Sequence, residues 1–242
     1  MDSRAFCITE GFQAFCNVAK ETLHELGTLA ALTYDGSSLR LIGGSLILLD
    51  ADTEFWDPRG LLGAAATGMV PDDTTNIKAL GETIEAYIKT LYSGGRQGEG
   101  IHGEGLFASA FRRLYYDHDF LSRLVGFGPG STPAGDDYLA GFLAGRDLLE
   151  GGPGRAQTVL RAGLRTSLER TTPAGRALLI GALEGVPPAY LVELTLAAAS
   201  WLVEQQEYTE NRLYEAVKNA LGHGATSGED ALCGFMYALG RR

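Results

Sequence analysis

The chain lacks the features that would place it in several common protein classes. It has 242 residues but only three cysteines, Cys7, Cys16 and Cys233, and no Cys-x-x-Cys pair. An odd number of isolated cysteines argues against a disulfide framework or a zinc site. No apolar run approaches the roughly 20 residues that a membrane-spanning helix needs, and the first residues show no basic segment followed by an apolar one. We therefore expect no membrane association and a cytoplasmic location.

Positive charge is also scarce. Twenty Lys and Arg residues stand against 30 Asp and Glu residues, which gives a net charge of −10. Duplex DNA and anionic lipid repel such a chain on average, so neither is an expected partner. The Gly-Lys-Ser/Thr of a P-loop and the Gly-x-Ser-x-Gly of a serine hydrolase are both missing. A local anion site is still compatible with the composition, because local fields need not follow net charge.

The apolar pattern changes near residue 72. Apolar runs at 29–34, 39–42 and 46–49, separated by turn residues, predict strands, and 56–60 reads as a loop. Farther along the chain the apolar residues recur at helical spacing. Strands followed by helices, without alternation, predict an α+β protein. We expect a small β-rich N-terminal domain (residues 1–71) and a larger helical domain (residues 72–242). Helices are expected over residues 134–149, 155–169, 174–184, 188–205, 209–221 and 228–240.

Two stretches of the helical part repeat one pattern, and a third shares half of it. Residues 126–142 and 222–235 both run from glycines through a hydroxyl residue to Gly, two acids and x-Leu-x-Gly-Phe. Residues 172–176 repeat Thr-Pro-Ala-Gly but carry Arg176 where Asp136 stands in the first copy. Each reads as a loop leading into a helix, whose first turn offers unpaired N–H groups and a partial positive charge. Three such helix starts indicate a polar site.

Ordinary helix capping is the alternative explanation of these motifs. Thr132 and Thr172 both suit an N-cap position, since each is followed by proline. Ser227 begins a variant capping box that ends in an aspartate. Capping explains less well the glycines inside the helices, Gly141 and Gly234, which cost about 1 kcal/mol each relative to alanine. Close helix packing at equivalent points would explain that cost.

The acids in the first turns of these helices conflict with an anion site, because negatively charged carboxylates repel an anion. Three solutions stay open: they face away, a divalent cation such as Mg²⁺ lies between them and the anion, or they carry out acid–base chemistry. Asp137 aligns with Asp230, and we expect the two to flank a pseudo-twofold site where the helix starts meet. These two are also the candidate Mg²⁺ ligands, and the sequence does not identify any other cofactor. The candidate catalytic residues are Asp136, Asp137 and Asp230; the candidate substrate-binding residues are Gly128, Gly130, Thr132, Thr172, Arg176, His223, Thr226 and Ser227.

Two of these candidates carry or can carry positive charge. Arg176 stands at a helix start, where its charge opposes the helix dipole. It is therefore a candidate to bind an oxyanion or carboxylate, and pairing with a nearby acid is the alternative. His223 lies in the second glycine loop, and the alternative for it is simple solvation.

The first motif resembles the hallmark of a known family. Residues 126–137, Gly-Phe-Gly-Pro-Gly-Ser-Thr-Pro-Ala-Gly-Asp-Asp, are similar to the Gly-x-Gly-x-Gly-x-Thr-Pro-x-Gly-Asp-Asp of the AllH-type family, and 224–230 resemble its Gly-x-Thr-Ser-Gly-x-Asp. Thr171, Thr172 and the helix after them match a third block of the family more loosely, and residues 46–58 resemble its N-terminal strand and Trp-x-Pro segment. Ser131 and Gly175 depart from the pattern, which often has an apolar residue and a serine there.

The resemblance implies a function. The best-known branch is the AllH-type subunit of oxamate carbamoyltransferase, in anaerobic allantoin breakdown and hence purine catabolism. Its reaction is carbamoyl transfer between oxalurate and phosphate, giving oxamate and carbamoyl phosphate. The resemblance therefore implies a transferase subunit that binds phosphate or a small carboxylate at helix N-termini, together with partner subunits. A non-catalytic scaffold or metabolite-sensing subunit, and a stand-alone Mg²⁺-dependent enzyme acting on a small acid, are the alternatives.

Overall fold

A computed structural model of the chain describes residues 57–67, 74–94, 118–152 and 158–240, together with the backbone of three strands. Contacts divide the chain into two compact units, Met1–Asp57 and Pro58–Arg242. That residues 1–71 form a domain of their own stays a prediction.

The predicted α+β class is wrong. In the first unit the structure describes β1 (Leu32–Tyr34), β2 (Ser38–Leu41) and β3 (Leu46–Leu48), which form an antiparallel sheet in the order β1-β2-β3. Each strand has only three or four residues, and the rest of the described chain is helical or connecting. The described residues therefore contain no β-rich N-terminal part, and helices define the class.

Part of this error has a clear physical cause. The sequence pattern predicts residues 59–67 as part of the β-rich region, yet Arg59–Thr67 is a helix, α2. Short apolar runs do not distinguish a buried strand from a buried helix. In α2, Leu62 and Ala66 are both buried while Ala64 between them is exposed, which is the helical and not the extended pattern, because a strand would bury all three on one face.

The predicted helices of the second unit are confirmed, with ends that agree within three residues. Its remaining elements are α3 (Thr74–Gly94), α5 (His118–Arg123), α6 (Ala134–Leu149), α7 (Thr158–Ser167), the 3₁₀ helix η2 (Leu168–Arg170), α8 (Pro173–Leu183), α9 (Ala189–Val203), α10 (Glu207–Leu221) and α11 (Ser227–Ala238).

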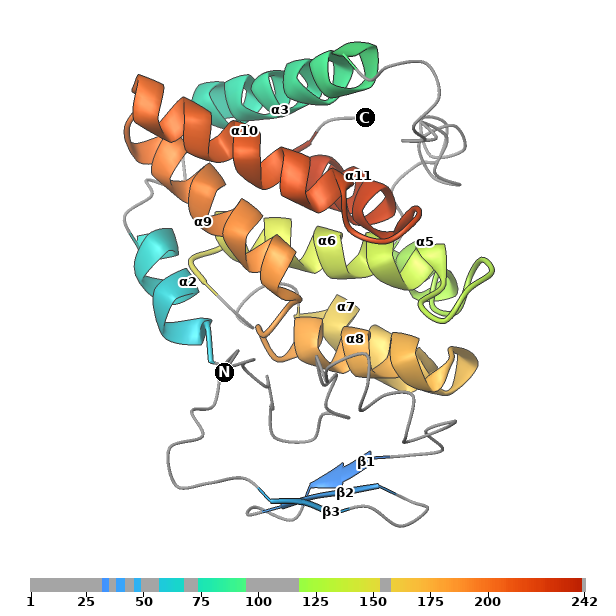
Figure 1. Ribbon diagram of the computed structural model, residues 1–242. Helices are drawn as coiled ribbons and strands as arrows, with labels where there is room; N and C mark the ends of the chain where they lie inside the picture. Colours follow the sequence, from blue (N-terminus) through green and yellow to red (C-terminus); the bar gives the residue numbers. More distant parts are fainter. Residues whose placement is uncertain are drawn as a thin grey trace. The chain divides into compact units, whose positions relative to one another are not determined.

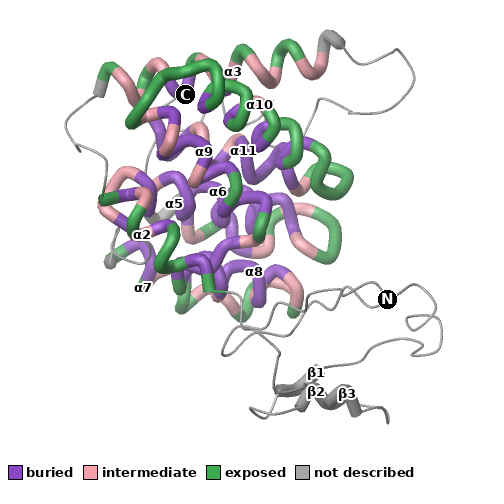
Figure 2. The backbone as a smooth tube through the Cα atoms, turned by 60° about the vertical axis from the view of Figure 1, so that its left-hand side comes forward, coloured by how far each residue is buried: buried purple, intermediate pink, exposed green. Residues whose placement is uncertain are grey.

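Helix α6 is the centre of the second unit (Figure 1). It packs against α11, α8, α9 and α2, and all but two of its residues are buried (Figure 2). A helix that is covered on all sides has small or apolar residues all round, and α6 is rich in alanine, glycine and leucine. Its two acids, Asp136 and Asp137, are therefore exceptional and need a physical explanation.

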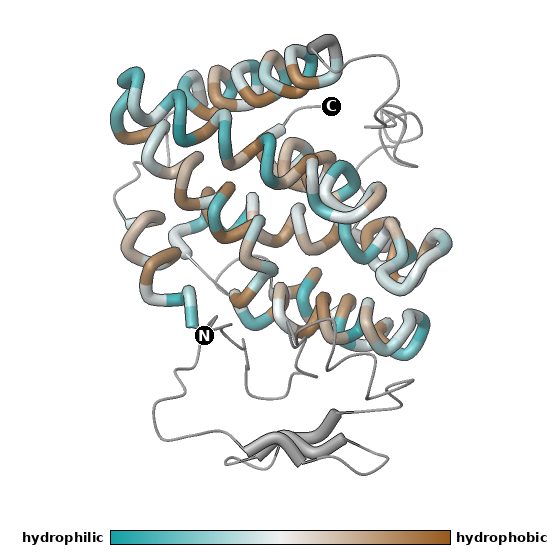
Figure 3. The backbone as a smooth tube through the Cα atoms, viewed as in Figure 1, coloured by the Kyte–Doolittle hydropathy of each residue, from teal (hydrophilic) through white to brown (hydrophobic). Residues whose placement is uncertain are grey.

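Helix α3 shows the opposite pattern, because hydrophobic and hydrophilic residues alternate along it (Figure 3). Leu80 and Ile84 are fully buried, while the side chain of Lys89 is 71% exposed. An apolar stripe along one side, with polar residues on the other, is typical of a helix that covers a core on one face. Helix α3 covers α10 and α9 in this way.

A buried ion pair links α6 to the helices beside it. Arg161 donates to Asp147, and its second terminal nitrogen donates to the carbonyl oxygens of Leu183 (2.8 Å) and Ala182 (3.3 Å) at the end of α8. Both side chains of the pair are less than a tenth exposed. The guanidinium thus satisfies a buried carboxylate and the last carbonyls of a helix together.

We expect Arg161→Met to lower the free energy of unfolding by about 3–5 kcal/mol, because it leaves a buried carboxylate without its cation. Urea unfolding measures this value. The matched control is Lys89→Met, which breaks an exposed pair with Glu85 (2.7 Å) and should cost less than about 1 kcal/mol. Equal losses of unfolding free energy in the two variants would contradict the assignment of Arg161 and Asp147 as a buried ion pair.

Candidate functional site

The two repeated motifs have the same local structure. In the first, the amide of Phe127 donates to Leu124 O (2.9 Å) and the amide of Gly135 donates to Phe127 O (2.8 Å). In the second, His223 N donates to Ala220 O and Gly228 N to His223 O, both at 3.0 Å.

A close backbone approach repeats as well. A Cβ on Gly135 would overlap Leu124 O, and a Cβ on Gly228 would overlap Ala220 O. The repeat seen in the sequence is therefore a structural duplication.

The loop of the first copy is longer than that of the second. Residues 127 and 135 are eight positions apart, whereas 223 and 228 are five apart. The extra length contains Gly128 and Gly130, whose φ angles of 106° and 108° favour glycine. Gly130 is exposed and Gly128 is partly exposed, so this part of the loop is accessible beside the start of α6.

The two helices that follow the loops cross at equivalent glycines. A Cβ on Gly141 of α6 would overlap Ala231 O of α11, and a Cβ on Gly234 of α11 would overlap Tyr138 O of α6. Ala231 and Tyr138 are equivalent positions of the two copies, so each helix presents the same contact to the other. This reciprocity defines a pseudo-twofold arrangement and confirms the close packing predicted from the two glycines.

The crossing brings the starts of α6 and α11 together, as predicted. Thr132 Oγ1 lies 3.3 Å from Ser227 Oγ, although the two residues are far apart in sequence. Both hydroxyls also hydrogen-bond to Asp137. Both residues are partly exposed, so this hydroxyl pair connects the buried carboxyl with the surface.

The hydroxyl pair corrects two predicted caps. The N-cap residue of α6 is Pro133 and that of α11 is Thr226, and neither supplies a side-chain hydrogen bond. The hydroxyls of Thr132 and Ser227 bond across the helix pair and do not cap their own helices. Thr172 does cap α8, as predicted, since its hydroxyl accepts from Gly175 N at 2.9 Å.

Asp137 is the buried acid at the centre of this network. It is 3% exposed, and its Oδ2 has no hydrogen-bond partner. Burial raises its pKa to about 7, and the hydroxyls of Ser227 and Thr132 oppose that rise while the charges of Asp230 and Asp136 add to it. Asp230, at the equivalent position of α11, is fully buried.

Asp136 has a different role from its neighbour. Its Oδ1 accepts from Gly126 N at 2.8 Å, and its Oδ2 accepts from the hydroxyl of Thr171. Burial raises its pKa, and these two hydrogen bonds oppose the rise. Both oxygens thus fasten the first glycine loop to the segment before α8. A Cβ on Gly175 would overlap Asp136 Oδ2, which explains the glycine at this position.

The third helix start joins the first through these contacts and not through the hydroxyl pair. Thr172 donates to Ser131 O. Arg176 forms an ion pair with Glu169, and its Nε donates to Leu168 O at 3.2 Å. The charge of Arg176 is therefore paired with an acid of its own segment, which is the alternative to binding an oxyanion or carboxylate.

The structure adds residues that the sequence did not single out. Tyr190, in the first turn of α9, has its pKa raised by burial and by the charges of Asp137 and Asp230. The ring of His223 stacks on it, with centroids 4.2 Å apart and planes at 26°. These contacts join elements distant in sequence, and no local motif marks them.

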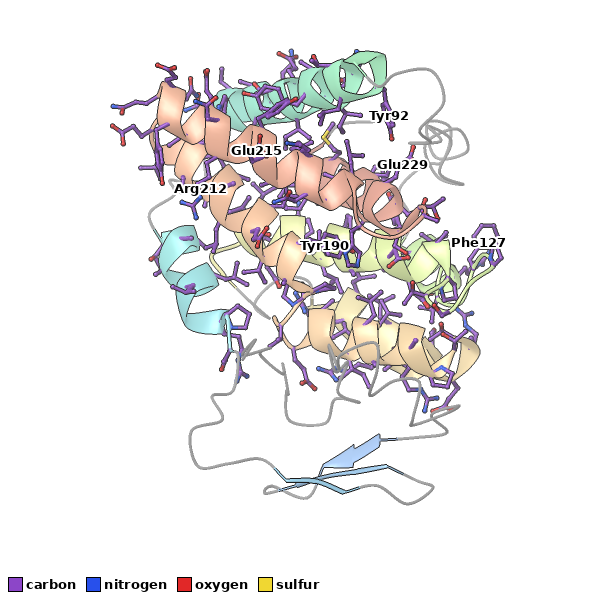
Figure 4. All side chains as sticks on the ribbon, viewed as in Figure 1. Tyr92, Phe127, Tyr190, Arg212, Glu215 and Glu229 are labelled. Atoms are coloured by element: carbon purple, nitrogen blue, oxygen red, sulfur yellow. The ribbon has the colours of Figure 1, made fainter. Side chains whose placement is uncertain are left out.

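A second tyrosine approaches the start of α11 from α3. Burial, followed by the charge of Glu229, raises the pKa of Tyr92. Glu229 is itself buried. Figure 4 shows Tyr92 and Glu229 near each other, Tyr190 on α9, and Phe127 projecting outward from the first loop.

Among the described residues, neither a positive charge nor a set of metal ligands is found beside Asp137. No basic side chain is among the groups that shift its pKa. In the part of the chain that the structure describes, no three His, Cys, Asp or Glu residues are placed to hold a metal ion. Asp137 and Asp230 alone would give Mg²⁺ the one or two carboxylates that it uses with phosphate ligands, so the Mg²⁺ site stays a prediction.

Fold and site together define a helical protein with a duplicated glycine-loop motif whose two copies meet at a buried carboxyl. Residues 124–239 match the family described as oxamate carbamoyltransferase subunit AllH, and this match supports an AllH-type assignment of that segment. The family description indicates a subunit of a carbamoyltransferase, which implies partner subunits. Residues 46–58 lie outside the match. No curated protein and no solved structure matches the chain.

Among the helices of the described residues, none combines the length and the apolar character required to span a bilayer.

Proposed function

We propose that the paired starts of α6 and α11 bind the small anion of an oxamate carbamoyltransferase reaction, and that Asp137 carries a proton there. The observation that carries this proposal is the hydroxyl pair, Thr132 and Ser227, bonded to a buried carboxyl with a pKa of about 7. The chain would act as one subunit of the enzyme, with partner subunits completing it.

The raised pKa of Asp137 reduces the repulsion that an ionised carboxylate would exert on a bound anion. At neutral pH this carboxyl is protonated about half of the time, and a neutral carboxyl donates a hydrogen bond instead of repelling an anion. The N-terminal turns of two helices add unpaired N–H groups and partial positive charge. Their joint field supports a small anion without a basic side chain among the described neighbours of Asp137.

The proposed reaction needs one mobile proton. A phosphate oxygen attacks the carbamoyl carbon of oxalurate, the carbon–nitrogen bond breaks, and the departing nitrogen of oxamate gains the proton that phosphate loses. A group with a pKa near the working pH transfers such a proton best. Asp137 meets that condition, and Thr132 and Ser227 connect it to the surface.

The duplication fits a ligand with two polar ends. Oxamate carries a carboxylate at one end and an amide at the other, and each helix start offers donors to one end. Asp230 stands opposite Asp137 in this arrangement. Gly128, Gly130 and Thr226 lie in the loops that border the hydroxyl pair, and their role in binding stays a prediction.

Binding of oxamate and phosphate, measured by calorimetry on the chain alone and with its partner subunits, tests the proposal. We expect Thr132→Val and Ser227→Ala each to raise the Kd about tenfold, which corresponds to one hydrogen bond of about 1.4 kcal/mol. Binding should also weaken between pH 6 and 8, because Asp137 loses its proton.

Thr166→Val is the matched control, since its exposed hydroxyl bonds only within α7, to Gly163 O at 2.8 Å. The proposal fails if neither ligand binds, or if both site variants bind as the control does. Tight binding without turnover in the assembled enzyme would instead favour a metabolite-sensing subunit. A requirement for added Mg²⁺ would assign the cation to Asp137 and Asp230.

A further inference from the structure

We propose that Tyr190 is a hydrogen-bond donor of this site and that His223 positions it by stacking on its ring. The inference rests on the proposed function and deepens it, because it adds a residue from a third helix. It also gives His223 a different role from the direct ligand binding predicted from the sequence.

Tyr190 reaches the site from α9, which packs against α6. It is 8% exposed, and its phenol lies close enough to Asp137 and Asp230 for both charges to act on it. A buried phenol beside two acids is held in place by its surroundings and not by solvent. Its position in the first turn of α9 brings a further helix start toward the carboxyls.

His223 is well suited to hold that ring. Its own amide donates to Ala220 O and its carbonyl accepts from Gly228 N, both at 3.0 Å. The backbone of His223 is thus fixed at the end of α10 and at the start of α11. Its imidazole, 4.2 Å from the ring of Tyr190 and nearly parallel to it, restricts the rotation of the phenol.

The chemistry of the two residues favours this division of roles. His223 is exposed as a whole, but partial burial lowers the pKa of its imidazole, so the ring is mostly neutral at neutral pH and attracts an anion weakly. The raised pKa of Tyr190 keeps the phenol protonated, so it stays a donor throughout the physiological range. The carboxyls beside it are acceptors whenever they are ionised.

The stack also breaks the pseudo-twofold symmetry of the site. The position equivalent to His223 in the first copy is Phe127, which makes the same backbone hydrogen bonds but is 50% exposed. Only the second copy therefore places a ring on Tyr190. A donor on one side would orient a ligand with two different ends.

Tyr190→Phe tests the donor, because it removes only the hydroxyl and keeps the stacked ring. We expect the Kd for oxamate, measured by calorimetry on the protein with its partner subunits, to rise about tenfold. The melting temperature should change by no more than about 2 °C, since the ring stays in place. His223→Ala should weaken binding to a similar degree, and His223→Phe should restore most of that loss.

The outcomes separate this inference from the proposed function. If the wild type binds oxamate and Tyr190→Phe binds it equally well, the donor is refuted and the proposed function stands. If His223→Phe binds as weakly as His223→Ala, the imidazole acts through its nitrogens and the positioning role is refuted. If the wild type binds neither oxamate nor phosphate, the proposed function fails and this inference fails with it.

Discussion

Gly141→Val is expected to prevent the helical unit from folding stably. A Cβ at this position would overlap the carbonyl oxygen of Ala231, and a backbone carbonyl inside a helix cannot move aside as a flexible side chain can. Overpacking of a core costs about 1–3 kcal/mol and sometimes more, and valine adds two methyl groups beyond that Cβ. The Cβ would lie 1.8 Å from that oxygen and 2.6 Å from the carbonyl carbon, an overlap well beyond ordinary overpacking, so we expect much of the total stability of about 5–15 kcal/mol to be lost. Urea unfolding or circular dichroism measures the effect.

Two further variants make this test specific. Gly234→Val should be as damaging, because a Cβ there would overlap the equivalent oxygen, that of Tyr138. Gly163→Ala is the matched control in α7, where a Cβ would meet no atom within 4 Å; it should stabilise the chain by about 0.5–1 kcal/mol. Normal folding of Gly141→Val would show that α6 and α11 do not cross at these glycines.

Asp137→Asn is expected to make the protein more stable at high pH and inactive in the assembled enzyme. The pKa of Asp137 rises from 3.8 to about 7 on folding, so the native state holds the proton more tightly than the unfolded chain does. The contribution of this group is fully present below about pH 4, and it is lost as pH rises to about 7. Asparagine carries no such charge, so the variant should lack this decline.

Urea unfolding at several values between pH 4 and 8 measures the difference. At pH 8 we expect the variant to exceed the wild type by roughly 4 kcal/mol, from about 1.4 kcal/mol for each unit of the shift from 3.8 to about 7. Loss of the proton carrier should lower turnover by about 10²–10⁴-fold. Parallel stability curves for the two proteins across this range would contradict the raised pKa.

Asp136→Asn provides the matched comparison. Both oxygens of Asp136 accept hydrogen bonds, from Gly126 N and Thr171, so its loss should loosen the first loop and lower stability at every pH. The sequence could not separate these two neighbouring acids. On α6 they face different helices, because successive residues of a helix point about 100° apart.

The elements that the sequence predicted well are those with a local cause. The helices from residue 134 onward follow from apolar residues at helical spacing, and the glycine contacts at Gly141 and Gly234 follow from the cost of glycine inside a helix. The α+β class failed because it relied on short apolar runs near the N-terminus. Helix α2 was missed for the same reason, since its buried face consists of only Leu62 and Ala66.

The caps and the tyrosine show the limit of local reasoning. Thr132 and Ser227 were expected to cap their own helices, but each found a partner across the helix pair. Tyr190 carries no motif, and its proximity to the acids depends on how α9 packs against α6. Residues that break a local preference are expected where function imposes its own geometry.

By itself, the sequence determined that this protein contains a duplicated glycine-loop and acid motif, and that motif indicated its resemblance to the AllH-type family. Those properties depend on residue types at fixed spacing, which the chain carries whether or not it is folded. Only the tertiary structure decided that the two copies meet at their helix starts, that Asp137 is buried without a cation among its described neighbours, and that Asp136 faces α8. Such properties depend on distances between segments far apart in sequence, and helix packing sets those distances.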